Sequence, residues 1–150
     1  MNIRMISRLS VLVLLSTFAI ACATNSMSKA EKTAAYNQFI ASEKLEELKS
    51  ITTFRYDGWS SLGAEHLIIS TSFNKPYLVK LRTRCYDLEF AQVIVVHNTG
   101  SSLQANFDSI SVPKNNHQKC YIGKLYKITK EQKKTLVKIG KIDKEEEEKS

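Results

Sequence analysis

The stretch that decides the fold class is HLIISTSFNKPYLVKLR, residues 66–82. Residues 66–73 are rich in apolar and β-branched side chains, which favour a strand. Residues 74–76 are Asn, Lys and Pro, which are typical of a turn. In residues 77–82 apolar side chains alternate with lysine and arginine, as in a strand that turns one face toward a core. The stretch therefore predicts two antiparallel strands joined by a tight turn.

Segments of the same kind recur along most of the chain after residue 50, separated by Gly, Asn, Ser and Pro. Residues 93–96 are continuously apolar, which predicts a central strand buried on both faces. The run 102–112 is long enough to contain a break. We therefore expect an α+β fold that is mainly β, with a small curved antiparallel sheet or partly open barrel. The predicted strands are 51–56, 66–73, 77–82, 92–97, 102–112 and 120–128.

A helix is predicted before this β region. Ser28 and Glu31 have the spacing of a capping box, in which each side chain satisfies a backbone N–H group of the other residue. A helix should therefore run over 29–49 and pack on the sheet through one apolar stripe. That stripe consists of Tyr36, Phe39 and Ile40.

A second, shorter helix is predicted after the β region. Thr129 and Gln132 repeat the capping-box spacing, and apolar residues stand shortly before Gly140, a residue type that often ends a helix. We expect a short closing helix there. Residues 141–150 include four consecutive glutamates and almost nothing apolar, so they predict a disordered acidic tail.

The first 21 residues have the features of a secretion signal. Arg4 and Arg8 precede an apolar run over 9–20, and Ala21 supplies a small residue at the expected cut. The run is shorter than the roughly 20 apolar residues that a membrane-spanning helix needs. We therefore expect residues 1–21 to be a cleaved signal peptide.

The next feature is the sequence Ala-Ile-Ala-Cys at 19–22, which resembles the bacterial lipobox. The resemblance implies that Cys22 carries lipid and begins the mature chain, held on a membrane by two or three acyl chains. Ala23 follows it instead of Asp, which by the same resemblance implies the outer membrane and its periplasmic face. The alternative is ordinary cleavage with an unmodified Cys22 and a soluble periplasmic protein. Residues 22–28 are interpreted as a lipidated tether.

The two remaining cysteines, Cys85 and Cys120, form an even pair in a chain expected in an oxidising compartment. We expect them to form a disulfide. A redox or metal-binding pair is the alternative, but there is no Cys-x-x-Cys motif and His117 is the one histidine close to either cysteine. Without signal, tether and tail, residues 29–140 have the size of one domain.

Aromatic, apolar and cysteine residues in the middle of the chain carry a family resemblance. They are Phe54, Trp59, the run YLVKL at 77–81, Cys85, Tyr86, Asp87, Leu88, Ala91, Phe107, Asp108, Cys120, Tyr121 and Ile122. With these residues, the core at 54–128 resembles a family of small proteobacterial secreted proteins and lipoproteins known only as a domain of unknown function. The resemblance implies a β-rich secreted domain with a Cys85–Cys120 link, and it implies no activity.

The chain is basic, with 22 Lys and Arg against 15 Asp and Glu. Residues 114–141 contain nine lysines and one acid, so this segment could contact lipopolysaccharide phosphates, anionic lipids or another anionic polymer. The alternative is a solvated lysine face that keeps the domain soluble. We expect no nucleic acid as a partner, because a periplasmic protein rarely meets it. The candidates for anionic contact are Lys124, Lys127, Lys133 and Lys134.

No catalytic motif is present: there is no Gly-x-Ser-x-Gly, phosphate-binding loop or His-Glu-x-x-His, and the three histidines lack metal-ligand spacing. We therefore expect no enzyme activity, cofactor or metal. A small hydrolase is the remaining alternative, and it would need Asp57 or Asp108 beside a histidine in one cleft. Trp59 either closes one end of the core, which we favour, or lines a ligand cleft.

These features together predict a non-enzymatic interaction or accessory module of the cell envelope. The lipid anchor would bind it to the membrane, and another envelope protein would be its partner. Binding of anionic envelope components through the lysine-rich segment is the alternative.

Overall fold

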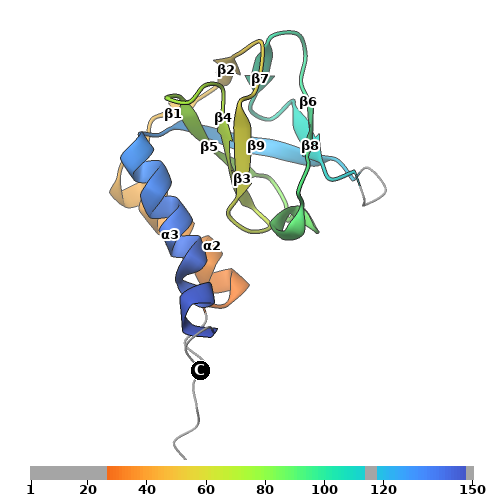
Figure 1. Cartoon of the computed structure of the whole chain (residues 1–150). Helices are drawn as coiled ribbons and strands as arrows, with labels where there is room; N and C mark the ends of the chain where they lie inside the picture. The colour runs from red at the N-terminus through yellow and green to blue at the C-terminus, as the bar shows by residue number, and fades with distance from the viewer. Residues whose placement is uncertain (1–26, 114–117, 148–150) are drawn as a thin grey trace, which may run out of the picture.

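The computed structural model describes residues 27–113 and 118–147, which form a curled antiparallel sheet with two helices side by side against one of its faces (Figure 1). The predicted signal peptide, Cys22 and His117 lie outside the described residues. The helices are α2 (Lys29–Ser42), the short η2 (Leu88–Phe90) and α3 (Lys130–Glu147). The strands are β1 (Glu47–Leu48), β2 (Ser50–Thr52), β3 (Gly58–Ser61), β4 (His66–Ser70), β5 (Pro76–Leu81), β6 (Val95–His97), β7 (Ser102–Gln104), β8 (Ser109–Ser111) and β9 (Cys120–Lys127).

The main sheet has the strand order β3-β4-β5-β9-β8-β6, and β1 adds to β9 beside this path. Every neighbouring pair is antiparallel, and β2 and β7 form a separate two-stranded sheet. The strands at the two ends of the order, β3 and β6, face each other across an open seam (Figure 1). The prediction of a curved, partly open barrel that is mainly β is therefore confirmed.

The predicted hairpin at 66–82 is present as β4 and β5. Its turn is closed by a hydrogen bond in which the Thr71 backbone N–H donates to the Lys75 carbonyl at 3.1 Å. The strand pairing is continuous from His66 opposite Lys80 to Ser70 opposite Pro76. Local turn chemistry and β-propensity therefore agree with the tertiary structure here.

Two hydrophobic cores lie on opposite faces of the sheet. Val79 and Leu81 of β5 belong to the core inside the curl, whereas Leu78 belongs to the core under the helices. Both faces of β5 are thus covered, although its alternating sequence predicted burial of one face. The inner core also contains Leu67, Ile69, Ile110, Ile122 and Leu125, and the helix-side core contains Tyr36, Leu62, Ile68, Tyr126, Ile128 and Leu136.

The capping box of α2 is confirmed, because the Glu31 N–H donates to Ser28 Oγ and the Ser28 N–H donates to the Glu31 carboxylate. The predicted length is wrong, since α2 ends at Ser42 and not near residue 49. Lys44 has φ of 47°, a left-handed conformation that ends the helix and lets the chain enter β1. Residues 47 and 48, which the sequence predicted as helix, form β1 and pair with β9 instead.

The capping box of α3 is also confirmed, with mutual hydrogen bonds of 2.9 and 3.1 Å between Thr129 and Gln132. The helix is longer than predicted, because it passes through Gly140 and ends at Glu147. The prediction of a disordered tail at 141–150 is therefore wrong as far as residue 147. One helical glycine costs about 1 kcal/mol, which lysine and glutamate, both good helix formers, can offset.

The prediction of a central strand at 93–96 is wrong. Only residues from 95 onward join a strand, β6, which ends the sheet, and the exposed fractions of Val93 and Val95 are 61% and 40%. An apolar run has the same sequence pattern whether strands bury it on both sides or it lies at the edge of a sheet. The pattern therefore does not predict its position. Sequence reasoning also missed β1 and β3, which are short and contain Glu, Gly and Ser.

The Cys85–Cys120 disulfide is present, with the two Cα atoms 5.6 Å apart. It joins the loop after β5 to the start of β9, the neighbouring strand, and both cysteines are buried in the inner core. No helix in residues 27–113 or 118–147 is both long and apolar enough to cross a membrane.

Candidate binding site

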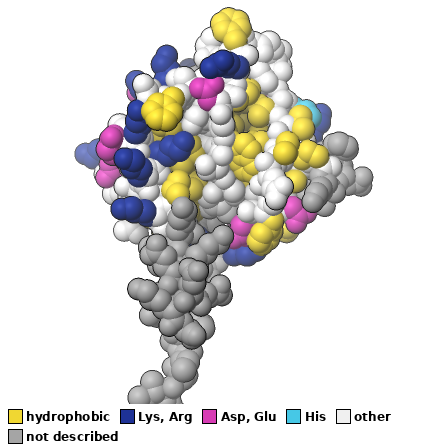
Figure 2. All heavy atoms as spheres, viewed as in Figure 1, with side chains coloured by type: hydrophobic (Ala, Val, Ile, Leu, Met, Phe, Trp, Pro, Cys, Tyr) yellow, Lys and Arg dark blue, Asp and Glu magenta, His cyan; other side chains and the backbone are white. Residues whose placement is uncertain are grey.

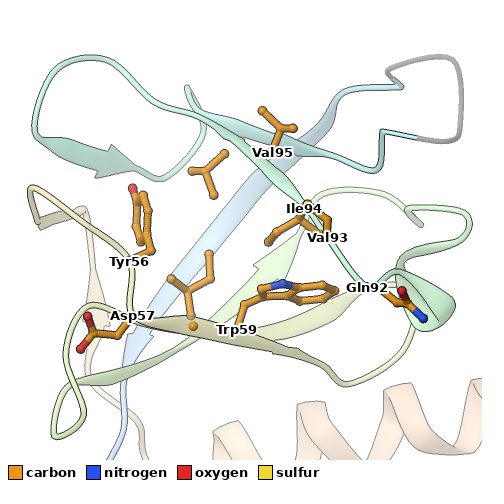
Figure 3. A pocket seen from close by; sticks show the side chains of 10 residues that line it. Tyr56, Asp57, Trp59, Gln92, Val93, Ile94 and Val95 are labelled. Carbon is orange, nitrogen blue, oxygen red and sulfur yellow. The ribbon is translucent and has the colours of Figure 1, made fainter.

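A cavity of about 550 Å³ lies in the seam between β3 and the segment that leads into β6 (Figure 3). This volume is within the range of small-molecule sites, which are typically about 300–1,000 Å³. We call it the seam cavity. It is lined by the apolar side chains of Trp59, Ile69, Val93, Ile94, Val95 and Val96 and by Tyr56, Asp57, Gly58 and Gln92.

Trp59 is held in the seam cavity by the pairing of β3 with β4. It lies directly opposite Ile69, so both side chains share the face of the sheet that turns toward the inner core. Trp59 packs on that core, as favoured from the sequence, and it also borders the cavity. It is the one tryptophan of the whole chain, so its fluorescence reports on this site.

Tyr56 lines the seam cavity, and its hydroxyl is buried. No hydrogen-bond partner for its oxygen is found in the described part of the chain. Burial, and secondarily the Asp108 carboxylate, raise the pKa of Tyr56 above its usual value. The hydroxyl is therefore protonated at neutral pH, and as an unpaired buried group it costs stability.

The charge of the seam cavity is set by Asp57. Among the described lining residues it is the one charged side chain, and Arg55 pairs with it at 3.1 Å on the solvent side. Since exposed ion pairs are weak, this partner can exchange for another cation. The lining therefore suits an uncharged or basic ligand better than an anion.

The wall of the seam cavity opposite Trp59 is the exposed apolar run identified above. Figure 2 looks onto this face and shows hydrophobic side chains gathered over the gap between β3 and β6. Val93 and Val95 are the most exposed of them, and Phe90 of η2 is also exposed nearby in the chain. Sequence reasoning missed this wall because it interpreted the same residues as a core strand.

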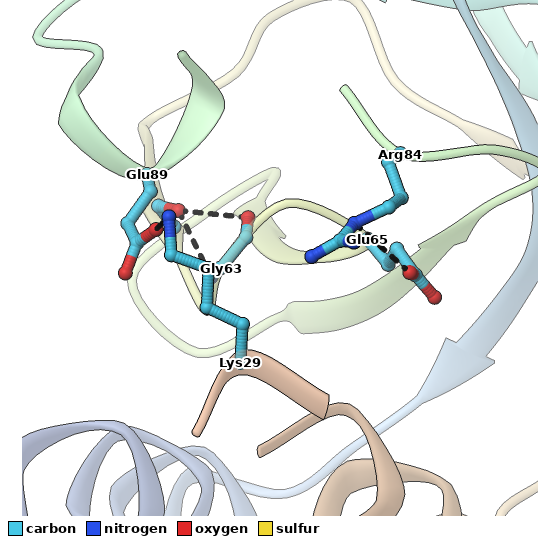
Figure 4. Close-up of polar contacts among 6 residues, drawn as sticks. Lys29, Gly63, Glu65, Arg84 and Glu89 are labelled. Carbon is cyan, nitrogen blue, oxygen red and sulfur yellow. Dashed lines mark hydrogen bonds and ion pairs between the residues drawn. The ribbon is translucent and has the colours of Figure 1, made fainter. Parts of the chain in front are cut away.

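Ion pairs position η2, which packs against β3 at one end of the seam (Figure 4). Lys29, at the start of α2, pairs with Glu89 at 3.1 Å, and Arg84 pairs with Glu65 at 3.7 Å. Exposed pairs of this kind contribute about 0–1 kcal/mol each, so they orient the loop more than they stabilise the domain.

A second, polar cavity of about 490 Å³ lies at the far side of β6 and contains His97 and Asp108 in its lining. His97 Nε2 lies 2.8 Å from Ser111 Oγ, but Ser111 is fully buried. Asp108 is 5% exposed and accepts a hydrogen bond from the Gln104 N–H at 2.6 Å. The structure thus brings Asp108, but not Asp57, into one cavity with a histidine.

His66 lies elsewhere, buried in β4 under α2. Among the described residues, no group of three or more His, Cys, Asp or Glu side chains is placed to hold a metal ion.

The four candidate lysines differ in their surroundings. Lys124 pairs with Glu47 at 2.8 Å, which raises the pKa of Lys124, and Lys133 Nζ donates to Ser70 Oγ at 3.3 Å. Lys127 is three residues along β9 from Lys124, so the two side chains leave opposite faces of the strand. Lys134 is exposed on α3.

Comparison with known proteins identifies a family of unknown function. No curated protein and no solved structure matches the chain. The model of a family of unknown function, DUF6491, matches residues 5–143, which include every described strand and most of α3. The chain therefore belongs to this family.

Proposed function

We propose that this chain is a cell-envelope lipoprotein on the periplasmic face of the outer membrane, and that it binds another molecule without chemical conversion through the seam cavity. The anchoring part rests on the signal-like residues 1–21 and the lipobox-like cysteine, Cys22. The binding part rests on one observation, an apolar cavity that is open at the edge of an otherwise well-packed sheet.

The apolar wall supports a binding role because exposing it has a cost. Covering apolar surface is worth about 25 cal/mol per Å². Val93 and Val95 leave such surface uncovered beside a cavity of ligand size, with a tryptophan as the opposite wall. Binding pockets generally have mostly apolar walls and a small number of placed polar groups.

The binding part is tested with two probes that share one ring system. N-phenyl-1-naphthylamine is uncharged, whereas 1-anilinonaphthalene-8-sulfonate is an anion. We expect the uncharged probe to quench Trp59 emission at micromolar concentrations and the anionic probe to bind at least tenfold more weakly, because Asp57 lines the cavity. Equal binding of both probes, or probe binding without a change in Trp59 emission, would contradict the site.

A matched pair of variants locates the probe. Val95→Lys places a cation in the wall of the cavity, and Phe107→Lys makes the same kind of change at an exposed position outside it. We expect Val95→Lys to weaken the uncharged probe and strengthen the anionic one. Phe107→Lys should change neither affinity.

The anchoring part is tested by the mass of the chain purified from the host envelope. We expect loss of residues 1–21 and added diacylglycerol and acyl mass at Cys22, in the outer-membrane fraction. An unmodified Cys22 in a soluble periplasmic fraction would leave the binding site intact and refute the lipoprotein.

A further inference from the structure

The two strands that border the seam cavity each have one side without a strand partner. In the described part of the chain, residues 92–97 make backbone hydrogen bonds only within the β6–β8 pair. Residues 57–62 make theirs only with β4. Two rows of backbone N–H and C=O groups therefore stand at the seam, available to another strand.

Apart from its short length of three residues, the edge at β6 lacks the features that normally keep such edges unpaired. Proteins protect exposed edges with charged side chains, proline or bulges. Residues 93–96 are Val, Ile, Val and Val, without a charge or a proline, and the pairing of residues 95–97 with β8 has no register shift. An unprotected apolar edge beside an apolar cavity is a template for an added strand.

We propose that an extended segment of a partner protein adds to β6 as a further strand and places one apolar side chain in the seam cavity against Trp59. This inference rests on the proposed function, since it names the ligand of the same cavity. In strand addition, backbone hydrogen bonds supply affinity and side-chain pockets at alternate positions supply specificity. The edge of β6 and the seam cavity supply these two elements side by side (Figure 3).

Charge complementarity defines the chemistry of this segment. Asp57 stands at the Tyr56 end of the seam cavity, and no lysine, arginine or histidine is among the described lining residues. The segment is therefore β-branched and apolar at alternate positions, free of acids, and carries a lysine or arginine that reaches Asp57 in exchange for Arg55.

A second copy of this chain fits the same features less well. Pairing of two copies would join two sheets side by side through the free edge of β6 in each copy. The edge of β3 and the interior of the seam cavity would stay uncovered. A single extended segment covers the edge and fills the cavity together.

The test is a selection from a random twelve-residue peptide library against the purified full chain, with Val95→Lys and Phe107→Lys as matched targets. We expect enriched peptides with alternating β-branched residues, at least one basic residue and no acids. They should bind the Val95→Lys protein at least tenfold more weakly and the Phe107→Lys protein unchanged. If the Val95→Lys protein does not fold, the same test uses Val93→Lys, because Val93 is more exposed than Val95.

The contribution of backbone hydrogen bonds to affinity is measured with one enriched peptide made in two N-methylated forms. N-methylation at alternate residues removes hydrogen-bond donors and keeps every side chain. We expect one of the two methylation registers to lose at least tenfold in affinity and the other to bind as the parent does. Equal binding of both registers would overturn strand addition.

The remaining outcomes separate this inference from the proposed function. No enrichment over the Val95→Lys target, while N-phenyl-1-naphthylamine still quenches Trp59, overturns the peptide and keeps the cavity as a small-molecule site. Loss of both overturns both proposals. A dimer in light scattering that Val95→Lys converts to monomer overturns the peptide in favour of a second copy.

Discussion

The ring of His66 lies against the ring of Tyr36, with centroids 5.4 Å apart and planes inclined by 49°. Both residues are almost fully buried, at the place where α2 covers β4. His66 Nε2 has no hydrogen-bond partner in the described part of the chain. This contact places a titratable group inside the helix-side core, where a positive charge is costly.

The stability of the domain should therefore fall in mild acid. Burial, and secondarily the charge of Lys80, lower the pKa of His66 from 6.5 to about 4. Between these values the unfolded chain holds the proton and the folded chain does not, so stability is present above pH about 6.5 and is lost as the pH falls through 4. The loss attributable to His66 is about 3 kcal/mol.

Urea unfolding at pH 7 and pH 4 measures this loss, and His66→Leu is the control because carboxylates titrate in the same range. The wild type should lose about 3 kcal/mol more than the variant between the two pH values. An equal loss in both proteins would show that His66 is not the responsible group.

The disulfide should provide a large share of the stability. Cys85 and Cys120 are 35 residues apart in sequence, and a loop of this length constrains the unfolded chain by about 3–4 kcal/mol. The double variant Cys85→Ala, Cys120→Ala should lose that amount in urea unfolding. A reductant should lower the stability of the wild type and leave that of the double variant unchanged.

The attachment of α3 should depend on Leu136. This side chain is fully buried in the helix-side core, so Leu136→Ala should cost about 2–5 kcal/mol through lost contacts and a cavity. Phe54→Ala is the control, because Phe54 is 93% exposed and the change should stay within about 0.5 kcal/mol. Thermal unfolding followed by circular dichroism compares them; similar melting temperatures would contradict the packing.

The hydroxyl of Tyr56 should not stabilise the fold. Because its buried oxygen lacks a described partner, Tyr56→Phe should leave the free energy of unfolding unchanged or raise it by about 1 kcal/mol. Urea unfolding without ligand measures this, and Tyr126→Phe is a second tyrosine for comparison. A loss of more than 1 kcal/mol in Tyr56→Phe would reveal a partner for the hydroxyl.

The features that the sequence predicted correctly depend on residues close together in the chain or on simple counting. The capping boxes at Ser28 and Thr129 join residues three positions apart, and the β4–β5 hairpin is set by its own turn and β-branched residues. The Cys85–Cys120 link follows from two cysteines in a chain expected in an oxidising compartment.

The candidate site was predicted in part. Trp59 was considered for a ligand cleft because of its size and its place beside a turn, and it lines the seam cavity. Tyr56 and the wall at 93–96 were not assigned to a site. Asp57 and Asp108 were each considered as a partner of a histidine, but no sequence signal shows that they line different cavities.

The sequence by itself determined the local elements: two capped helices, the hairpin and the cysteine pair. The tertiary structure decided which apolar runs became core and which became a binding wall. Val93 to Val96 is more continuously apolar than Leu78 to Leu81, which contains Lys80, yet β5 lies between β4 and β9 whereas β6 ends the sheet. The physical reason is that burial of a segment depends on which distant strand packs beside it. Hydrogen bonding within a turn depends only on residues close together in the chain.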